Sequence, residues 1–309
     1  MAIELSNLTF TDEDDVVPTS GVESILNTGI ANTLAGNDRI TGIGNGNGIA
    51  NGGSINTGNG NDKIIGISYS TEEYYFGFAT SGNFNSGDGN DIITGLGPIG
   101  IFHYGQYNRY TGTFNEFETG EGNDIITGIG RNIGLASYGG VILTRGGNDI
   151  IIGSGGSIGI NTQAGYGGSG GIYTEDGDDI IIGSGQIGIS MSGGSIDTGH
   201  GNDSIIANGG FDGNCSVVLG YGNDYLKGFG RGNYFGTGNY YQPPADEDTL
   251  ELTSGSYTVS YTVLEYQGTA VSFTKDGIIM NTFQFEKLIA GSTTYDFSSL
   301  TEGQTIVVA

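Results

Sequence analysis

The chain has 309 residues, with 62 glycines, 4 prolines and no tryptophan. Its 34 Asp and Glu residues against 9 Lys and Arg give a formal net charge of −25 at pH 7. This charge excludes nucleic acid as a partner and argues against membrane insertion, because phosphates and anionic membranes attract basic surfaces, and it makes cations the natural partners.

The first segment, Met1 to Asp15, is acidic and has neither the basic region nor the apolar region of a Sec signal peptide. We expect residues 1–24 to form an N-terminal cap. The chain is then either cytoplasmic or exported by another route. Its single cysteine, Cys215, cannot form an intramolecular disulfide.

A repeat begins after this segment and is expected to form a solenoid over residues 25–240. Gly-Asn-Asp or a near variant occurs eight times, at intervals of 21 to 33 residues. The repeated aspartates are Asp38, Asp62, Asp91, Asp124, Asp149, Asp179, Asp203 and Asp224. From Asp62 onward an apolar residue stands seven positions before each one, namely Ile55, Phe84, Phe117, Ile142, Ile172, Ile196 and Val217. The seven-residue spacing is constant, whereas the interval from one aspartate to the next varies. This combination indicates coils of one cross-section that carry inserted loops of different length.

Each unit predicts a strand (Ile55 to Thr57), a tight turn (Gly58 to Asp62) and a second strand (Lys63 to Gly66). A third strand follows in most copies with the pattern apolar-Gly-apolar, as in Ile99-Gly100-Ile101. Three strands in one repeat fit one coil of a three-sided parallel β-helix. We therefore expect an all-β fold, a right-handed parallel β-solenoid of about eight coils with a C-terminal β cap.

The turns resemble the calcium-binding nonapeptide of RTX (hemolysin-type) proteins, Gly-Gly-x-Gly-x-Asp-x-aliphatic-x. Gly87-Asp88-Gly89-Asn90-Asp91-Ile92-Ile93 matches it closely, as does the unit that ends at Asp124. The resemblance implies that the eight aspartates bind several Ca²⁺ ions between stacked turns, with help from backbone carbonyls. The carbonyls expected to take part lie near Gly58, Gly60, Gly87, Gly89, Gly120, Gly122, Gly147, Gly177, Gly199, Gly201, Gly220 and Gly222. Calcium prefers six to eight oxygen ligands of this kind.

Stacked coils would place the aspartates in a column about 4.8 Å apart, where neighbouring charges repel by about 1 to 3 kcal/mol. Calcium would remove this repulsion, so folding and metal binding are expected to be coupled. The motifs are not in tandem, which argues against a two-sided roll. Leu34, Arg145 and Glu175 replace the second glycine, and Arg145 weakens the sites that flank Asp149. The alternative is a metal-free ladder of hydrogen-bonded turns.

Thr57 belongs to a column of Thr or Ser residues that alternation turns inward, as structural residues. The longest insertions, Ser68 to Thr80, Phe102 to Thr113 and Asn161 to Gly170, are expected to be loops. One of them carries a candidate ligand-binding cluster of His103, Tyr104, Tyr107, Arg109 and Tyr110. This cluster keeps open a lyase-type or epimerase-type β-helix enzyme, or a noncatalytic polysaccharide-binding protein. No nucleophile and base pair stands out, so we expect no enzyme.

Glycine becomes rarer over residues 241–309, and strands are predicted at Tyr257 to Tyr266 and Ala270 to Phe273. The segments at Asp248 to Leu252 and Phe285 to Ile289 resemble the region that follows RTX repeats. That resemblance implies a cap near a C-terminal type I secretion signal; a plain β cap is the alternative. The sequence thus predicts a calcium-stabilised secreted or cell-surface protein with a structural or binding role, exported without a leader. Polysaccharide, other cell-surface material and further copies of the chain remain open as partners.

Overall fold

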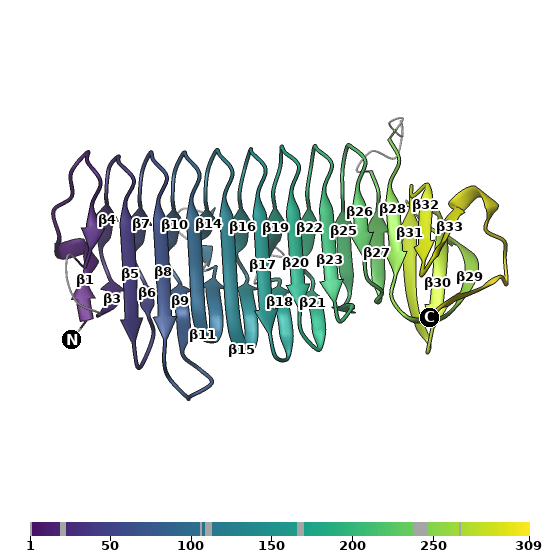
Figure 1. Ribbon diagram of the computed structural model, residues 1–309, viewed down its shortest axis with the longest axis horizontal. Coiled ribbons are helices and arrows are strands. Elements are labelled where there is room, and N and C mark those ends of the chain that lie inside the picture. Colours follow the sequence, from purple (N-terminus) through teal and green to yellow (C-terminus); the bar gives the residue numbers. More distant parts are fainter. Residues whose placement is uncertain are drawn as a thin grey trace.

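The computed structural model describes residues 2–18, 23–105, 107–108, 113–165, 170–237, 246–265 and 267–309. Over these residues the chain winds as a long parallel β-solenoid, with its two ends at opposite ends of the long axis (Figure 1). The C-terminal part closes the solenoid with antiparallel strands. The predicted all-β solenoid with a β cap is confirmed.

A complete coil contributes three strands, and equivalent strands of successive coils pair in parallel. We call the three columns the post-turn, middle and pre-turn stacks, by their position relative to the Gly-Asn-Asp turn. The post-turn stack consists of β2 (Val16–Val17), β5 (Arg39–Gly44), β8 (Lys63–Ser68), the first parts of β11 (Ile92–Tyr104) and β15 (Ile125–Tyr138), β17 (Ile150–Gly155), β20 (Ile180–Ser184), β23 (Ser204–Asn208), β26 (Tyr225–Lys227), β28 (Thr249–Leu252) and β32 (Lys287–Ala290).

The middle stack consists of β1 (Ala2–Glu4), β3 (Ser24–Asn27), β6 (Ile49–Asn51), β9 (Phe76–Thr80), the second parts of β11 and β15, β18 (Ile158–Gln163), β21 (Ile187–Ser192) and β24 (Phe211–Gly213). The pre-turn stack consists of β4 (Ile30–Asn32), β7 (Ser54–Asn56), β10 (Asn83–Asn85), β14 (Glu116–Glu118), β16 (Val141–Leu143), β19 (Gly171–Tyr173), β22 (Ser195–Asp197), β25 (Cys215–Val218) and β27 (Gly232–Phe235).

The remaining strands form the cap and one small hairpin. The cap strands are β29 (Gly255–Leu264), β30 (Gly268–Lys275), β31 (Ile278–Phe283), β33 (Thr293–Asp296) and β34 (Thr305–Val308), and the hairpin pairs β12 (Tyr107–Asn108) with β13 (Thr113–Phe114). Two short 3-10 helices, η1 (Leu5–Asn7) and η2 (Phe297–Ser299), complete the described structure. The cap joins the pre-turn stack directly, because β31 pairs in parallel with β27.

The core is a set of ladders in which one side chain repeats from coil to coil. Ile126 stacks on Ile93 and Ile151, and all three are fully buried. The predicted apolar residues seven positions before each aspartate are buried in the same way. Since each buried isoleucine contributes about 1.5 to 3 kcal/mol of transfer free energy, these ladders supply the main drive for folding.

The outward side of the post-turn stack is also aliphatic, which the sequence analysis did not predict. Ile92, Ile125, Ile150 and Ile180 form one column that is neither buried nor fully exposed, and Ile129 beside it is 44% exposed. Both isoleucines of the motif are therefore in ladders, one facing inward and one facing outward.

The inserted segments contain more strand than expected. The prediction of loops over Ser68 to Thr80, Phe102 to Thr113 and Asn161 to Gly170 was wrong in part, because β9, the end of β11 and the end of β18 extend into them. These strands form because their backbones pair with the coils on either side. The predicted strand from Tyr257 corresponds to β29, although its last residue, Tyr266, lies outside the described residues.

Candidate metal centre

The eight repeated aspartates form a single buried column along the turn edge of the solenoid. Their exposed fractions lie between 0% and 2%. In each of the eight, one carboxylate oxygen, Oδ1, accepts a hydrogen bond from the backbone N–H of the aspartate one coil earlier. The Asp62 N–H donates to Asp91 Oδ1 at 2.7 Å, and the Asp91 N–H donates to Asp124 Oδ1 at 2.8 Å. The column is thus a regular ladder that links every coil to the next.

The ladder is longer than the sequence predicted. At the N-terminal end the Asp15 N–H donates to Asp38 Oδ1. At the other end the Asp224 N–H donates to Asp248 Oδ1, and the Asp248 N–H donates to Glu286 Oε2. From the sequence, Asp248 and Glu286 are predicted only as parts of the segments that resemble a C-terminal cap. A signal was present, because Asp248-Thr249-Leu250 keeps the order of an aspartate, a variable residue and an aliphatic residue.

The second carboxylate oxygen distinguishes this column from an ordinary hydrogen-bonded ladder. Oδ2 of all eight repeated aspartates is buried and has no hydrogen-bond partner in the described part of the chain. A buried acceptor without a partner costs about 1 to 3 kcal/mol, and more if it is charged. Such atoms are rare in folded proteins and call for a proton, a water or a metal ion.

Burial makes these carboxyl groups hard to ionise. It raises the pKa of Asp91 to about 7 and that of Asp203 to about 8, and in both cases the aspartates on either side raise it further. Burial also raises the pKa of Asp62 to about 6, while the nearby Thr57 hydroxyl acts in the opposite direction. At neutral pH the column therefore carries negative charge only at a substantial free-energy cost, which a bound cation would remove.

The Thr and Ser residues form a second buried column beside the aspartates, as predicted. Thr57, Ser86 and Thr119 are completely buried. The Thr57 hydroxyl donates to the Ser86 carbonyl at 2.9 Å, and the Ser86 hydroxyl donates to the Thr119 carbonyl at 3.2 Å. This column is structural, because it lies inside the solenoid and the hydroxyls of Thr57 and Ser86 connect one coil to the next, although the Thr119 hydroxyl makes no such bond.

An exposed ladder runs along the outside of the same turns in the opposite direction. Here the later coil donates to the earlier one: the Asn61 N–H donates to Asn37 Oδ1, and the Asn90 N–H donates to Asn61 Oδ1. The alternative of hydrogen-bonded turn ladders therefore describes part of the structure correctly. It does not explain the inner column, because an asparagine there would accept the same N–H without a buried charge.

The turn glycines are required by both backbone conformation and space. Gly60 and Gly89 have φ values of +148° and +138°, which L side chains rarely adopt. A Cβ on Gly89 would lie 1.7 Å from the Gly60 carbonyl oxygen, and one on Gly87 would lie 1.6 Å from the Gly58 carbonyl oxygen. These carbonyls thus face the next coil, along the direction in which the predicted ions would be stacked. Gly120, Gly122, Gly147, Gly177, Gly199, Gly201, Gly220 and Gly222 repeat the arrangement.

The three residues that replace a turn glycine keep its conformation. Leu34, Arg145 and Glu175 have φ values of 77°, 70° and 69°. The side chain of Arg145 pairs with Glu118 at 2.8 Å and with Glu175 at 3.5 Å, and it is 39% exposed. The guanidinium therefore lies among surface carboxylates, so the expected interference of Arg145 with ions near Asp149 has a weaker basis than the sequence indicated.

Among the described residues, no three His, Cys, Asp or Glu side chains come together as a metal-binding group. This follows from the architecture, because each turn supplies one carboxylate to the column. An ion between two turns would have to combine Oδ2 atoms of successive aspartates with backbone carbonyls. Calcium accepts such mixed oxygen sets, so the residues present fit it better than a metal that needs several acidic or imidazole ligands at once.

The structure describes the side chains of two members of the candidate ligand-binding cluster, and these two lie in different surroundings. His103 is completely buried, and burial lowers its pKa to about 4, while Tyr104 is 46% exposed. The backbone of Tyr107 belongs to β12, and Arg109 and Tyr110 lie outside the described residues. His103 therefore belongs to the core, where its ring meets Phe117 edge to face.

Comparisons with known proteins add no relative. No family model, no curated protein and no solved structure matches the chain. In the part of the chain that the structure describes, no helix has the length and apolar character needed to cross a membrane.

Proposed function

We propose that the aspartate column binds several Ca²⁺ ions and that the protein is a calcium-stabilised β-solenoid of the RTX type with a structural or binding role. The observation that carries this proposal is the column of eight buried carboxylates, each with one oxygen that lacks a partner. Protons satisfy these oxygens below the raised pKa values, which are about 7 for Asp91 and about 8 for Asp203. A divalent cation would satisfy them at neutral pH by displacing those protons and pairing with the charged carboxylates.

The ions would lie between successive turns, held by Oδ2 of adjacent aspartates and by turn carbonyls such as those of Gly58 and Gly60. Like charges about 4.8 Å apart repel by about 1 to 3 kcal/mol, and each bound ion would replace one such repulsion with two attractions. The best sites are expected between Asp62, Asp91 and Asp124 and between Asp203 and Asp224, because the turns of these aspartates keep glycine at both positions. Calcium binding would therefore stabilise the stacking of coils directly.

We further propose that the protein acts outside the cell. With a net charge of −25, the chain repels itself when metal is absent. Submicromolar cytoplasmic calcium would leave it unfolded and fit for export, and millimolar extracellular calcium would fold it. We assign no catalytic role, since the imidazole of His103 is buried in the core.

The test is to count bound ions. Metal-stripped protein is equilibrated by dialysis with calcium at neutral pH, and the bound metal is measured by mass spectrometry. The wild type is expected to retain several ions, and a variant with Asp91→Asn and Asp124→Asn should retain at least one fewer. Retention of no calcium would reject the proposal, and equal retention by both proteins would place the ions elsewhere.

A further inference from the structure

One of the three strand stacks ends earlier than the others. The middle stack stops at β24, whereas the post-turn stack continues through β26, β28 and β32. Beyond β24 the next coil has only a short irregular segment in this position. The Phe229 carbonyl of that segment accepts a hydrogen bond from the Phe211 N–H. The turn between β30 and β31 folds back over this step, so the step becomes a groove at the junction of solenoid and cap.

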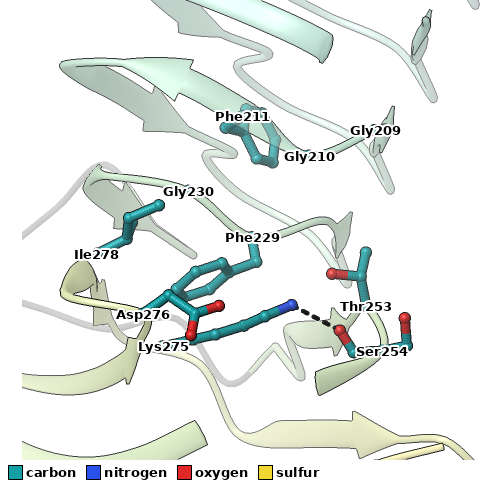
Figure 2. Close-up of a pocket in the computed structure, with 10 residues that line it drawn as sticks. All are labelled: Gly209, Gly210, Phe211, Phe229, Gly230, Thr253, Ser254, Lys275, Asp276 and Ile278. Atoms are coloured by element: carbon teal, nitrogen blue, oxygen red, sulfur yellow. Dashed lines mark hydrogen bonds between the residues drawn. The ribbon is translucent and has the colours of Figure 1, made fainter. Parts of the chain in front are cut away.

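The groove contains two adjoining cavities of about 390 and 510 Å³. Phe211 and Ile278 line both of them. Figure 2 shows the first cavity, with Lys275 extending past the Phe229 ring toward Ser254 and with Asp276 on the same side. The second cavity shares Phe211 and Ile278 with the first and is also lined by Asp212, Gly213, Asn214 and Arg231.

Each cavity combines one basic side chain with one acidic side chain. Lys275 and Asp276 line the first, and Arg231 and Asp212 line the second. Two of the nine basic residues of a chain with a net charge of −25 thus lie in one groove, where their charges balance those of the two carboxylates. A lining without net charge favours a neutral ligand and gives no advantage to an anionic one.

The position of Lys275 is fixed by the surrounding structure. Its Nζ donates to the Ser254 carbonyl at 2.7 Å and lies 5.4 Å from the centre of the Tyr257 ring and 6.0 Å from that of Phe229. An ammonium group has three donors, so hydrogen bonds to a ligand remain available. Asp276 beside it is exposed, and a carboxylate accepts two hydrogen bonds from neighbouring hydroxyls.

The rest of the lining suits a ligand with both apolar and polar faces. Ile278, which lines both cavities, is 38% exposed, and the Phe211 and Phe229 rings add apolar surface to the first. Gly209, Gly210 and Gly230 leave backbone groups uncovered by side chains, and Thr253 and Ser254 add hydroxyls. Sugars have this dual character, since their C–H faces pack on apolar side chains while their hydroxyls donate and accept hydrogen bonds.

We propose that this groove binds a neutral oligosaccharide, with one sugar unit in each cavity and with Phe211 and Ile278 in contact with both. Balanced charge excludes a preference for uronic acids, and the acidic surroundings disfavour phosphate-bearing ligands. The site is separate from the aspartate column and needs the solenoid only to be folded. It is also distinct from the inserted segment around Tyr104.

The test is native affinity electrophoresis in calcium-containing gels. Hydroxyethylcellulose, galactomannan and dextran serve as neutral probes, and carboxymethylcellulose serves as an acidic probe on the same backbone as the first. At least one neutral polysaccharide should retard the protein, and carboxymethylcellulose should not retard it more strongly than hydroxyethylcellulose does. Absence of retardation by every neutral probe, or a clear preference for the acidic one, overturns the proposal.

Variants locate the site. Asp276→Asn in the first cavity and Asp212→Asn in the second each remove a hydroxyl acceptor on an exposed side chain, so each should weaken retardation about tenfold without changing the melting temperature. Asp88→Asn, which removes the same charge from an exposed turn of the solenoid, is the control and should have no effect. Retardation that both groove variants leave unchanged would place sugar binding elsewhere and reject the groove.

Discussion

Replacing Asp91 with asparagine separates the two roles of the aspartate column. The asparagine Oδ1 can still accept the Asp62 N–H, but the side chain no longer ionises. Burial raises the pKa of Asp91 from 3.8 to about 7, so ionising it costs about 4 kcal/mol more in the folded protein than in the unfolded chain. Between these two pH values the folded state holds a proton that the unfolded state releases, so metal-free stability falls as the pH rises.

In the presence of a chelator, Asp91→Asn should therefore be more stable than the wild type at pH 8, and this advantage should disappear by pH 4. The amide nitrogen introduces a buried donor that costs about 1 to 3 kcal/mol if it stays unpaired, which leaves a net gain of about 1 to 3 kcal/mol at pH 8. Because the metal-free wild type is expected to be poorly folded at pH 8, that gain should appear as a stronger β signal of the variant at room temperature. Where both proteins give a melting transition, the variant should melt a few degrees higher.

The order should reverse in calcium, because the variant lacks one ligand. Thermal melts followed by circular dichroism, at pH 4, 6 and 8 and with chelator or calcium, measure all of these effects. The matched control is Asp88→Asn, which removes the same charge from an exposed residue of the same turn. If chelated Asp91→Asn were less stable than the wild type by the same amount at pH 8 and pH 4, ionisation of the column would carry no cost and the reasoning would be refuted.

Three further predictions concern the turns and the core. Gly89→Ala should destabilise the protein by at least about 3 kcal/mol, because its Cβ would lie 1.7 Å from the Gly60 carbonyl oxygen; an unchanged melting temperature would contradict the described stacking. Leu34→Gly should raise the urea midpoint by the equivalent of about 1 kcal/mol, because φ at Leu34 is 77°, a conformation that glycine adopts without strain. The control, Leu26→Gly in β3, should lower the midpoint, and equal effects of the two substitutions would show that φ at Leu34 is not a source of strain. Burial lowers the pKa of His103 from 6.5 to about 4, so the folded wild type loses stability as the pH falls below 6.5. The free energy of unfolding of His103→Leu, relative to that of the wild type, should therefore rise by about 2 kcal/mol between pH 7 and pH 5, as measured in thermal melts. A difference that stays constant with pH would show that His103 does not titrate in this way.

The repeating part of the fold could be predicted from the sequence because each coil repeats the same local pattern. A fixed distance between Ile142 and Asp149, for example, places one in the core and the other in the column. Alternation along the strand correctly placed Thr57 inside. The same rule applied to Ile92 and Ile93 would have predicted the outward aliphatic column, since neighbouring strand residues face opposite sides.

The ends of the column were harder to predict because they lack the glycine turn. Asp248 follows Ala245-Asp246-Glu247, and here the side chain of Asp246 accepts the Gly222 N–H across the coils. The groove beside Phe211 could not be predicted at all. It depends on one stack ending before the others and on the return of the β30–β31 turn, and neither leaves a local sequence pattern.

The most direct test of the account is a calcium titration of chelator-treated protein at pH 7.5, followed by circular dichroism and thermal melting, with magnesium as the control. The metal-free protein should be poorly folded, and calcium should produce a cooperative gain of β signal and a large rise in melting temperature that magnesium does not reproduce. A metal-free protein already folded at pH 7.5 and unaffected by calcium would contradict the account, and the aspartate column would then be a ladder of hydrogen bonds alone.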